Sequence, residues 1–349
     1  AMRAVDQPKD QPFRFAIPLE VSLTPSNSGF IARRGSETIW VLPLSSKGAL
    51  SLNIILSPYN LPKGAYIYVY DHDRQIIRGA FTAESTSGTL SMPVMPVPGE
   101  RLVLECHFPG TRIPENSVGV TQVAHDFIGF FGPEGIKDFY YGRSGDCEVD
   151  INCSTNPLYL TASRSVVRLL VAGTELCTGV MVNNTGNLSK PYLITANHCI
   201  EDSSLAKNTI FVFNYRSPFC DGPDMTNIYT LTGSHLRATN ADIDFSLVEL
   251  NQFPPLVSKP YLAGWDITAT PPANTFAIHH PEGDVMKLSI DDHAPVTASY
   301  PEEGFVSSGF WRVLKWDLGT TERGSSGGPL FDQNGRLRGT LTGGAATCK

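Results

Sequence analysis

Short strand-like runs, rich in apolar residues, are separated by polar turn residues over much of the first third of the chain. Examples are residues 37–42, 50–56, 65–70 and 102–106. Runs of this length that are bounded by Gly, Pro, Asp and Ser are typical of β-strands joined by turns. No window has the apolar spacing of a long amphipathic helix. We therefore predict an antiparallel β-sandwich in this part of the chain.

The second half contains further strand-like runs that are more uniformly apolar, at residues 166–171, 178–182, 192–195 and 209–213. Between the two halves, residues 109–143 hold several Pro and Gly turn signals and read as a connector. The sequence is thus predicted to be all-β, with two parts joined by a linking segment.

Composition agrees with a strand-and-turn protein. The chain has 349 residues, of which 17% are charged, with 31 Gly and 26 Pro. The net charge of −7 gives no basic face for a nucleic-acid partner. No apolar run reaches the roughly 20 residues of a membrane span. No signal peptide is visible at the N-terminus, so we expect any export signal to lie outside this chain.

Cysteine usage points to an oxidising compartment. Six of the seven cysteines lie in the second half, and an even number there favours disulfides. The sequence alone allows 15 pairings of six cysteines. No spacing suggests a zinc site, and we predict neither a metal nor a cofactor. The remaining cysteine, Cys106, is expected to be a buried, unreactive thiol.

A candidate nucleophile lies in residues 324–330 (GSSGGPL). A serine hydroxyl needs a base to take its proton and donors to stabilise the oxyanion. Glycines beside it allow backbone N–H groups to converge on one point. Taken alone, this stretch is equally compatible with an ordinary Gly/Ser turn.

Residues that would complete a catalytic triad are present. His198 follows an apolar strand in residues 193–199 (LITANHC), and Asp244 opens residues 244–250 (DFSLVEL). The order His, Asp, Ser along the chain is that of chymotrypsin-like proteases. Asp242 competes with Asp244 for the acidic role, and Ser325 competes with Ser326 for the nucleophilic one.

These motifs resemble those of the trypsin/chymotrypsin superfamily, and more specifically those of bacterial lysyl endopeptidases. The resemblance covers about residues 142–349, with a weaker likeness of the first 140 residues to that family's propeptide. It implies a chymotrypsin-like double six-stranded β-barrel with the active site between the barrels. The supporting stretches are residues 146–153, 177–179, 182–185, 263–266 and 277–281.

The resemblance assigns a role to each residue of the site. His198 would be the general base, Asp244 its orienting partner and Ser326 the nucleophile, while Asp242 would be solvated. The backbone N–H groups of Gly324 and Ser326 would form the oxyanion hole. Ser325 occupies a position where most of the superfamily has an aspartate that pairs with a newly cut N-terminus, so that activation switch is absent.

The resemblance also implies where substrate binds. Thr342, Gly343 and Gly344 would bind the substrate backbone, although lysyl enzymes have a histidine where Thr342 stands. The carboxylate that selects lysine would lie beyond Lys349, so we expect the protease domain to be C-terminally incomplete and hypothesise a cut after Lys349. The implied disulfides are Cys147–Cys348, Cys153–Cys220 and Cys177–Cys199.

The expected organisation is a propeptide-like or accessory β-sandwich over residues 1–112, a connector and processing region over 113–141, and the protease domain over 142–349. Lys137 and Arg143 are the candidate processing points. We expect a monomeric serine endopeptidase, secreted or located in the periplasm or at the cell surface, that cleaves proteins or peptides after Lys or another basic residue. The alternative is a catalytically silent protease-fold protein that binds or adheres.

Other conspicuous residues are expected to be structural. His72, between two aspartates, is more consistent with a solvated turn than with a metal site. His279 and His280 are adjacent on a predicted strand and would point to opposite faces, so they could not easily share a ligand. Three tyrosines are expected to pack half-buried on one sheet face: Tyr66, Tyr68 and Tyr70.

Overall fold

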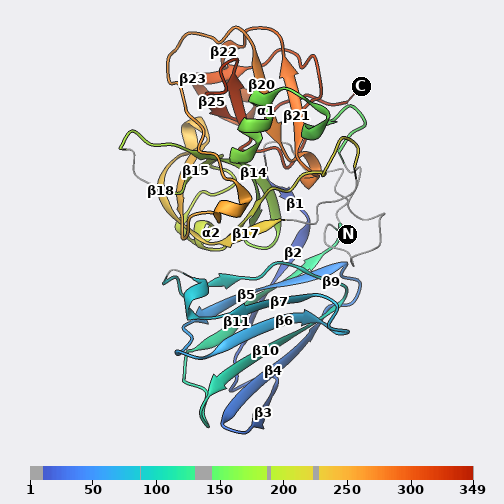
Figure 1. Cartoon of the computed structure of the whole chain (residues 1–349), viewed down its shortest axis with the longest axis vertical. Helices are drawn as coiled ribbons and strands as arrows, with labels where there is room; N and C mark the ends of the chain where they lie inside the picture. The colour runs from blue at the N-terminus through green and yellow to red at the C-terminus, as the bar shows by residue number, and fades with distance from the viewer. Residues whose placement is uncertain (1–10, 87, 130–143, 187–189, 223–227, 349) are drawn as a thin grey trace.

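The computed structural model describes residues 11–86, 88–129, 144–186, 190–222 and 228–348. An N-terminal β-sandwich lies at one end of the molecule, and two smaller β-barrels lie at the other (Figure 1). The expected all-β, chymotrypsin-like architecture with a preceding sandwich is confirmed. Within the described residues, no helix is long and apolar enough to cross a bilayer.

Two five-stranded antiparallel sheets form the sandwich, with orders β3-β4-β10-β6-β7 and β2-β11-β5-β8, β9 also pairing with β5. Inward-facing Trp40, Ile54 and Leu104 are fully buried between them. The strands are β2 (Ala16–Leu23), β3 (Phe30–Arg34), β4 (Glu37–Ser45), β5 (Ser51–Tyr59), β6 (Tyr66–Asp71), β7 (Ile77–Phe81), β8 (Met92–Pro93), β9 (Val97–Pro98), β10 (Arg101–Pro109) and β11 (Val118–Asp126).

The expected end of the sandwich at residue 112 is wrong. Strand β11 lies within the segment predicted as a connector, yet it pairs with both β2 and β5. Its register shifts at Val120 and Gln122, which breaks the simple alternation that would mark a strand. The sandwich therefore extends at least to Asp126, and most of the remaining connector lies outside the described residues.

The first barrel is an eight-stranded sheet with the order β17-β16-β13-β14-β15-β19-β18 and β1 added to β14. Its strands are β1 (Phe13–Arg14), β13 (Val166–Val171), β14 (Glu175–Val182), β15 (Tyr192–Thr195), β16 (Thr209–Phe213), β17 (Tyr229–Thr232), β18 (Ser234–Asn240) and β19 (Phe245–Leu250). The short helix α2 (Ser203–Lys207) lies in this barrel. Helix α1 (Pro157–Ala162) precedes β13 but packs on the second barrel, where the Tyr159 and Phe276 ring centroids lie 4.5 Å apart. Uniformly buried strands such as β13 match the apolar runs of the sequence.

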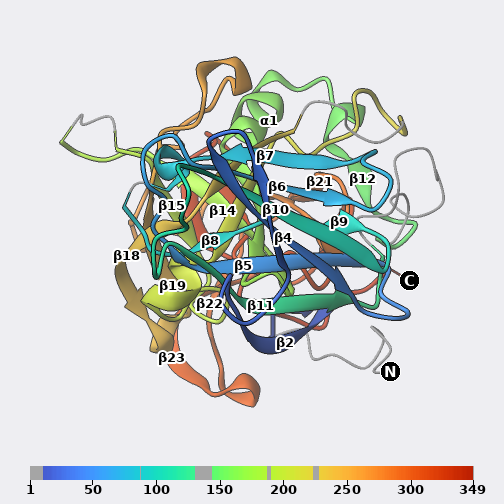
Figure 2. The ribbon, with the colours of Figure 1, turned by 90° about the horizontal axis from the view of Figure 1, so that it is seen from below.

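The second barrel is a five-stranded sheet with the order β12-β21-β20-β24-β25, beside a two-stranded ribbon, β22-β23, which projects from the side of the molecule (Figure 2). The two barrels are thus unequal in strand number rather than six-stranded each. The strands are β12 (Val149–Asp150), β20 (Thr275–His279), β21 (Lys287–Asp291), β22 (Val296–Tyr300), β23 (Phe305–Arg312), β24 (Pro329–Asp332) and β25 (Leu337–Thr340).

Sandwich and first barrel share an apolar core. Phe13, Phe15 and Ala16 pack with residues that end the sandwich and with residues of the barrel. β1 is a strand of the barrel, although it directly precedes the sandwich. The other members of this shared core are Ala124, Ile128, Leu170, Leu176, Ile210, Val212, Tyr215 and Val285.

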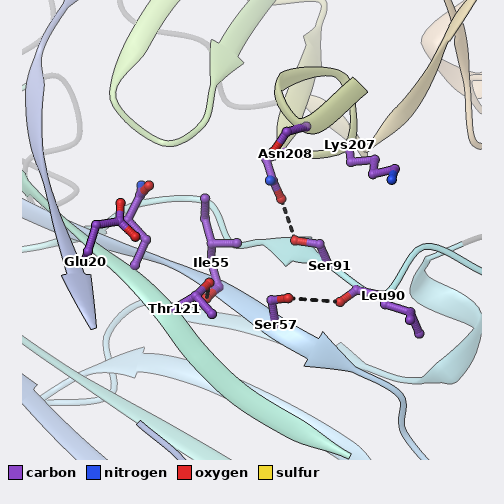
Figure 3. A pocket seen from close by; sticks show the side chains of 10 residues that line it. Glu20, Ile55, Ser57, Leu90, Ser91, Thr121, Lys207 and Asn208 are labelled. Carbon is purple, nitrogen blue, oxygen red and sulfur yellow. Dashed lines mark hydrogen bonds between the residues drawn. The ribbon is translucent and has the colours of Figure 1, made fainter. Parts of the chain in front are cut away.

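Polar contacts border this shared core. Asn53 Nδ2 donates to the Gly173 carbonyl at 2.7 Å, and Gln122 Nε2 donates to the Ala172 carbonyl at 2.8 Å. At one side the two parts leave a cleft of about 510 Å³, bridged by a Ser91–Asn208 hydrogen bond (Figure 3). The interface is therefore specific as well as apolar.

Replacing Phe15 by Ala should destabilise the whole chain, because this fully buried ring fills the core shared by sandwich and barrel. We expect the free energy of unfolding to fall by about 3–5 kcal/mol in urea titrations. Phe219→Ala is the control, since that ring is 59% exposed. Equal midpoints for Phe15→Ala and the parent chain would contradict a shared core.

Candidate active site

His198 and Asp244 meet where two paired strands end. β15 precedes His198 and pairs with β19, which begins directly after Asp244. His198 Nδ1 lies 2.8 Å from Asp244 Oδ2, and the His198 backbone N–H donates to Asp244 Oδ1 at 2.9 Å. This two-point contact fixes the imidazole and makes Nδ1 the protonated nitrogen, because a carboxylate only accepts.

Asp244 differs sharply from its competitor Asp242. Asp244 is 1% exposed and has a left-handed backbone, with φ +49°, at the end of the 3-10 turn η5 (Ala241–Ile243). An aspartate tolerates this conformation better than most residues. Asp242 lies exposed within η5. Of the two carboxylates, only Asp244 is hydrogen-bonded to His198 within the described residues.

Residues 324–328 hold the candidate nucleophile and are named the nucleophile turn for that reason. They pack against β14 and the turn that holds His198. The Ser326 carbonyl oxygen accepts from the Thr178 N–H at 2.8 Å and lies 3.8 Å from Cys199 Sγ, next to His198. Gly327 has φ +76°, and a Cβ there would meet the Thr178 carbonyl oxygen at 2.4 Å. Only glycine fits so close an approach.

Two N–H groups of this turn are left unused. Ser325 N donates to the Glu322 carbonyl, Gly327 N to the Leu341 carbonyl and Gly328 N to the Ser325 carbonyl. Among the residues that the structure describes, nothing accepts from the N–H groups of Gly324 and Ser326. His198 Nε2 is likewise without a hydrogen-bond partner in that part of the chain. Two N–H donors without an acceptor are the groups needed to bind an oxyanion, and an imidazole nitrogen without a partner is the group needed to accept a proton.

Ser325 is committed to a different contact. It is fully buried, and its Oγ lies 2.8 Å from His279 Nδ1. His279 Nε2 in turn lies 2.9 Å from Ser289 Oγ. A hydroxyl enclosed in this way is not available to substrate. The Ser326 hydroxyl has no hydrogen bond to His198 Nε2 among the described residues, and its carbonyl oxygen lies beside Cys199, the residue after His198.

The adjacent pair His279 and His280 is structural, as expected. His280 faces away from the Ser325 contact, with Nδ1 3.0 Å from the Asp284 carbonyl oxygen. Burial lowers the pKa of each histidine to about 3. Both are therefore neutral at pH 7, and they contribute hydrogen bonds rather than charge.

The expected substrate segment begins beside the nucleophile turn. Leu341 exchanges two backbone hydrogen bonds with Gly327 and Gly328, at 2.7 and 2.8 Å. Thr342, Gly343 and Gly344 follow this contact directly, without regular secondary structure. Thr342 is 7% exposed. The segment then reaches Cys348.

All three expected disulfides are present: Cys147–Cys348, Cys153–Cys220 and Cys177–Cys199. Cys106 is buried and unpaired, and burial raises the pKa of its thiol. The Cys177–Cys199 bond joins β14 to the residue after His198, so it supports the site directly. Cys147–Cys348 anchors the segment that follows Thr342.

An acidic pair lies near this anchor. The Glu322 carboxylate accepts from the Gly145 N–H at 3.0 Å. Burial, and then the negative charge of Glu322, raise the pKa of Glu148 to about 9. Glu148 is therefore protonated at neutral pH. The sequence did not indicate this, because Glu148 lies two residues after the exposed Asp146 and no local pattern marks its carboxyl group as buried.

Other sequence candidates do not form a site. His72 lies in an exposed turn after β6, and Tyr66 stacks on His107 with ring centroids 4.4 Å apart. His293 lies 3.5 Å from buried Asp291 and 3.2 Å from Asp317, and Lys315 also contacts Asp317.

The chain is similar to known proteases. Residues 141–349 match the family described as lysyl endopeptidase, C-terminal domain. A lysyl endopeptidase of Pseudomonas aeruginosa is 29% identical over 330 residues, covering 88% of this chain and 69% of the relative.

Solved structures give weaker likenesses. The inactive form of the Rv3671c protease of Mycobacterium tuberculosis has a TM-score of 0.37 at 18% identity, covering 56% of this chain and 86% of that protein. Deg5 has a TM-score of 0.36 at 18% identity, covering 52% of this chain and 81% of that one.

Glu148→Gln should flatten the decline of stability at alkaline pH. The folded chain retains the Glu148 proton up to a pKa of about 9, whereas the unfolded chain loses it near the ordinary value of 4.5. The folded state therefore binds more protons across this window, and the free energy of unfolding falls by about 1.4 kcal/mol per pH unit as pH rises.

The measurement is urea unfolding at pH 7, 8 and 9. Buried His279 and His280 change the pH dependence of stability only below about pH 6.5, because there they bind protons in the unfolded chain but not in the folded one. They therefore do not affect the slope between pH 7 and 9. The exposed neighbour Asp146 gives the control, Asp146→Asn, which should retain the parent slope. A Glu148→Gln slope equal to the parent slope would refute the assignment.

Proposed function

The chain belongs to the lysyl endopeptidase family and is a serine endopeptidase, and we propose that it works through a triad of Ser326, His198 and Asp244. The observation that best supports this triad is the two-point contact between Asp244 and His198. This contact uses Nδ1 of the imidazole and leaves His198 Nε2 without a hydrogen-bond partner. That nitrogen belongs to the residue beside Cys199, which borders Ser326.

In this proposal, His198 Nε2 takes the Ser326 hydroxyl proton as Oγ attacks the scissile carbonyl carbon. The N–H groups of Gly324 and Ser326 stabilise the oxyanion. Asp244 stabilises the imidazolium, and His198 then donates its proton to the leaving amine. Water attacks the acyl-enzyme in a second round of the same steps. The unspent donors favour this chemistry over a catalytically silent binding protein.

The proposed preference is for cleavage after lysine, or more broadly after a basic residue. It rests on the family and on the name of the Pseudomonas relative. Thr342, Gly343 and Gly344 would bind the substrate backbone by strand-like hydrogen bonds.

The proposed life cycle is export of a monomeric precursor to an oxidising compartment, which the three disulfides support. The sandwich would be a propeptide, with a permanent accessory domain as the alternative. The proposed domain limits become residues 11–129 for the sandwich with β1 and 144–348 for the protease barrels. Lys137 and Arg143, the candidate processing points, lie outside the described residues.

Asp244→Asn should lower kcat on the order of 10⁴-fold on a lysyl peptide, because the amide no longer holds the correct imidazole tautomer. Asp242→Asn is a matched control two residues away, and it should retain nearly the parent kcat because Asp242 is exposed. Circular dichroism checks that both variants fold. Equal losses in the two variants would remove Asp244 from the triad.

Cleavage-site profiling on a mixed peptide library tests mechanism and specificity together. We expect cuts after lysine with the parent chain and none with Ser326→Ala, which lacks the nucleophile. Ser325→Ala is the neighbouring control and should retain the parent specificity. Cuts after other residues would discard the lysyl preference, and cuts that persist in Ser326→Ala would discard the nucleophile.

The parent chain and Ser326→Ala also test whether the sandwich is removed by proteolytic processing. N-terminal sequencing of secreted protein should find a start between residues 138 and 144 if the sandwich is a propeptide. An intact chain in an active preparation would make it an accessory domain. A Ser326→Ala chain that is cut only when it is mixed with the active parent would show that one molecule cuts another.

A further inference from the structure

The carbonyl oxygens of the turn from Arg323 to Ser326 all accept hydrogen bonds. Glu282 N donates to Arg323 O, and Gly328 N donates to Ser325 O at 2.8 Å. The other two bonds come from one residue, Thr178. Its Oγ1 donates to Gly324 O at 2.9 Å, and its backbone N–H donates to Ser326 O at 2.8 Å. Thr178 thus holds the turn at both ends.

The direction of the Thr178 hydroxyl is determined by its surroundings. The His280 backbone N–H lies 3.2 Å from Thr178 Oγ1 and can only donate. The single hydroxyl proton is therefore directed at the Gly324 carbonyl oxygen, which can only accept. Thr178 is fully buried, so water does not compete for either bond.

These hydrogen bonds to carbonyl groups determine the direction of the N–H groups of Gly324 and Ser326, which have no acceptor among the described residues. A planar peptide unit carries its C=O and N–H in opposite directions, so a held carbonyl also fixes the following N–H. Gly324 has φ +84° and no side chain to restrict it. The Gly324 and Ser326 N–H groups share their peptide planes with the carbonyls of Arg323 and Ser325, which accept from Glu282 N and Gly328 N. Thr178 holds the next plane on the other side of each residue, through Gly324 O and Ser326 O. Both planes that flank Gly324, and both that flank Ser326, are therefore held.

The Thr178 and Ser325 contacts are not ion pairs, although Glu282 and Arg323, which share one of the backbone bonds to the turn, are joined by one at 2.9 Å. Ser325 stands where an aspartate would be expected from the resemblance, and its hydroxyl contacts His279 instead. Thr178 and Ser325 are both neutral, and their contacts are formed while the chain still carries its N-terminal part. A neutral support needs no newly released amino group to complete it.

We propose that Thr178 is a positioning residue: its hydroxyl and its backbone N–H hold the peptide planes that follow Gly324 and Ser326, and so keep the turn in the conformation that presents the oxyanion-binding N–H groups of these two residues. This inference rests on the proposed function, because it concerns the same reaction. Thr178 touches no reacting atom; it acts through the carbonyl groups of the nucleophile turn.

Thr178→Val tests the inference, since valine retains the shape of threonine but cannot donate to Gly324 O. We expect kcat to fall at least tenfold with KM within about twofold, against the 100–1000-fold loss typical of removing an oxyanion donor outright. Thr178→Ser retains the hydroxyl and should restore kcat to within about threefold of the parent. Hydrogen exchange of residues 321–328 should quicken in Thr178→Val only.

Thr209→Val is the matched control, because Thr209 is also fully buried and donates to a backbone carbonyl, that of Leu205, at 2.7 Å. It should lose similar stability but retain the parent kcat. If Thr178→Val does not fold, Thr178→Ser and Thr178→Ala replace it, and the serine variant must be the more active of the two.

The outcomes separate the two proposals. An active parent with equal kcat in Thr178→Val overturns the positioning role alone, as does a Thr178→Ser variant as slow as Thr178→Val. A folded parent without activity towards any peptide overturns the proposed function and the catalytic role of Thr178 together. Unchanged exchange in residues 321–328 would show that the hydroxyl does not hold the turn.

Discussion

One edge of strand β14 is the constraint on which the rest of the molecule depends. β13 occupies the other edge along residues 166–171. On the shared edge, β1 pairs at Leu176 and β15 pairs from Val180 onward. Between them, at Thr178, the nucleophile turn takes the place of a strand partner. Three segments from distant parts of the sequence are thus aligned by the hydrogen-bonding groups of one strand.

The sequence allowed prediction of those features that depend on local pattern or on a short motif. Alternating and uniformly apolar runs indicated most of the strands, and the motifs around His198, Asp244 and Ser326 indicated the site before any geometry was known. β11 was missed because its register shifts disturb the alternation that identifies a strand. A disturbed strand becomes recognisable only when its partners are known.

Features that depend on distant partners could not be predicted. The hydroxyl of Thr178 acquires its role from Gly324, which lies 146 positions away. Glu148 is an ordinary carboxylate in sequence, and its raised pKa arises from burial and from Glu322. Likewise, what distinguishes Ser325 from Ser326 is the hydrogen bond between Ser325 and His279, and no spacing in the sequence reveals that contact.

The apolar core shared by sandwich and barrel also bears on what a cut in the linking segment would mean. Phe13, Phe15 and Ala16 cover barrel residues that would otherwise face water, and β1 covers an open sheet edge. Hydrolysis of one peptide bond between the two parts leaves this buried surface untouched. Cleavage of the linking segment and separation of the two parts are therefore distinct events. Separation has its own free-energy cost, which grows with the apolar area that becomes exposed to water.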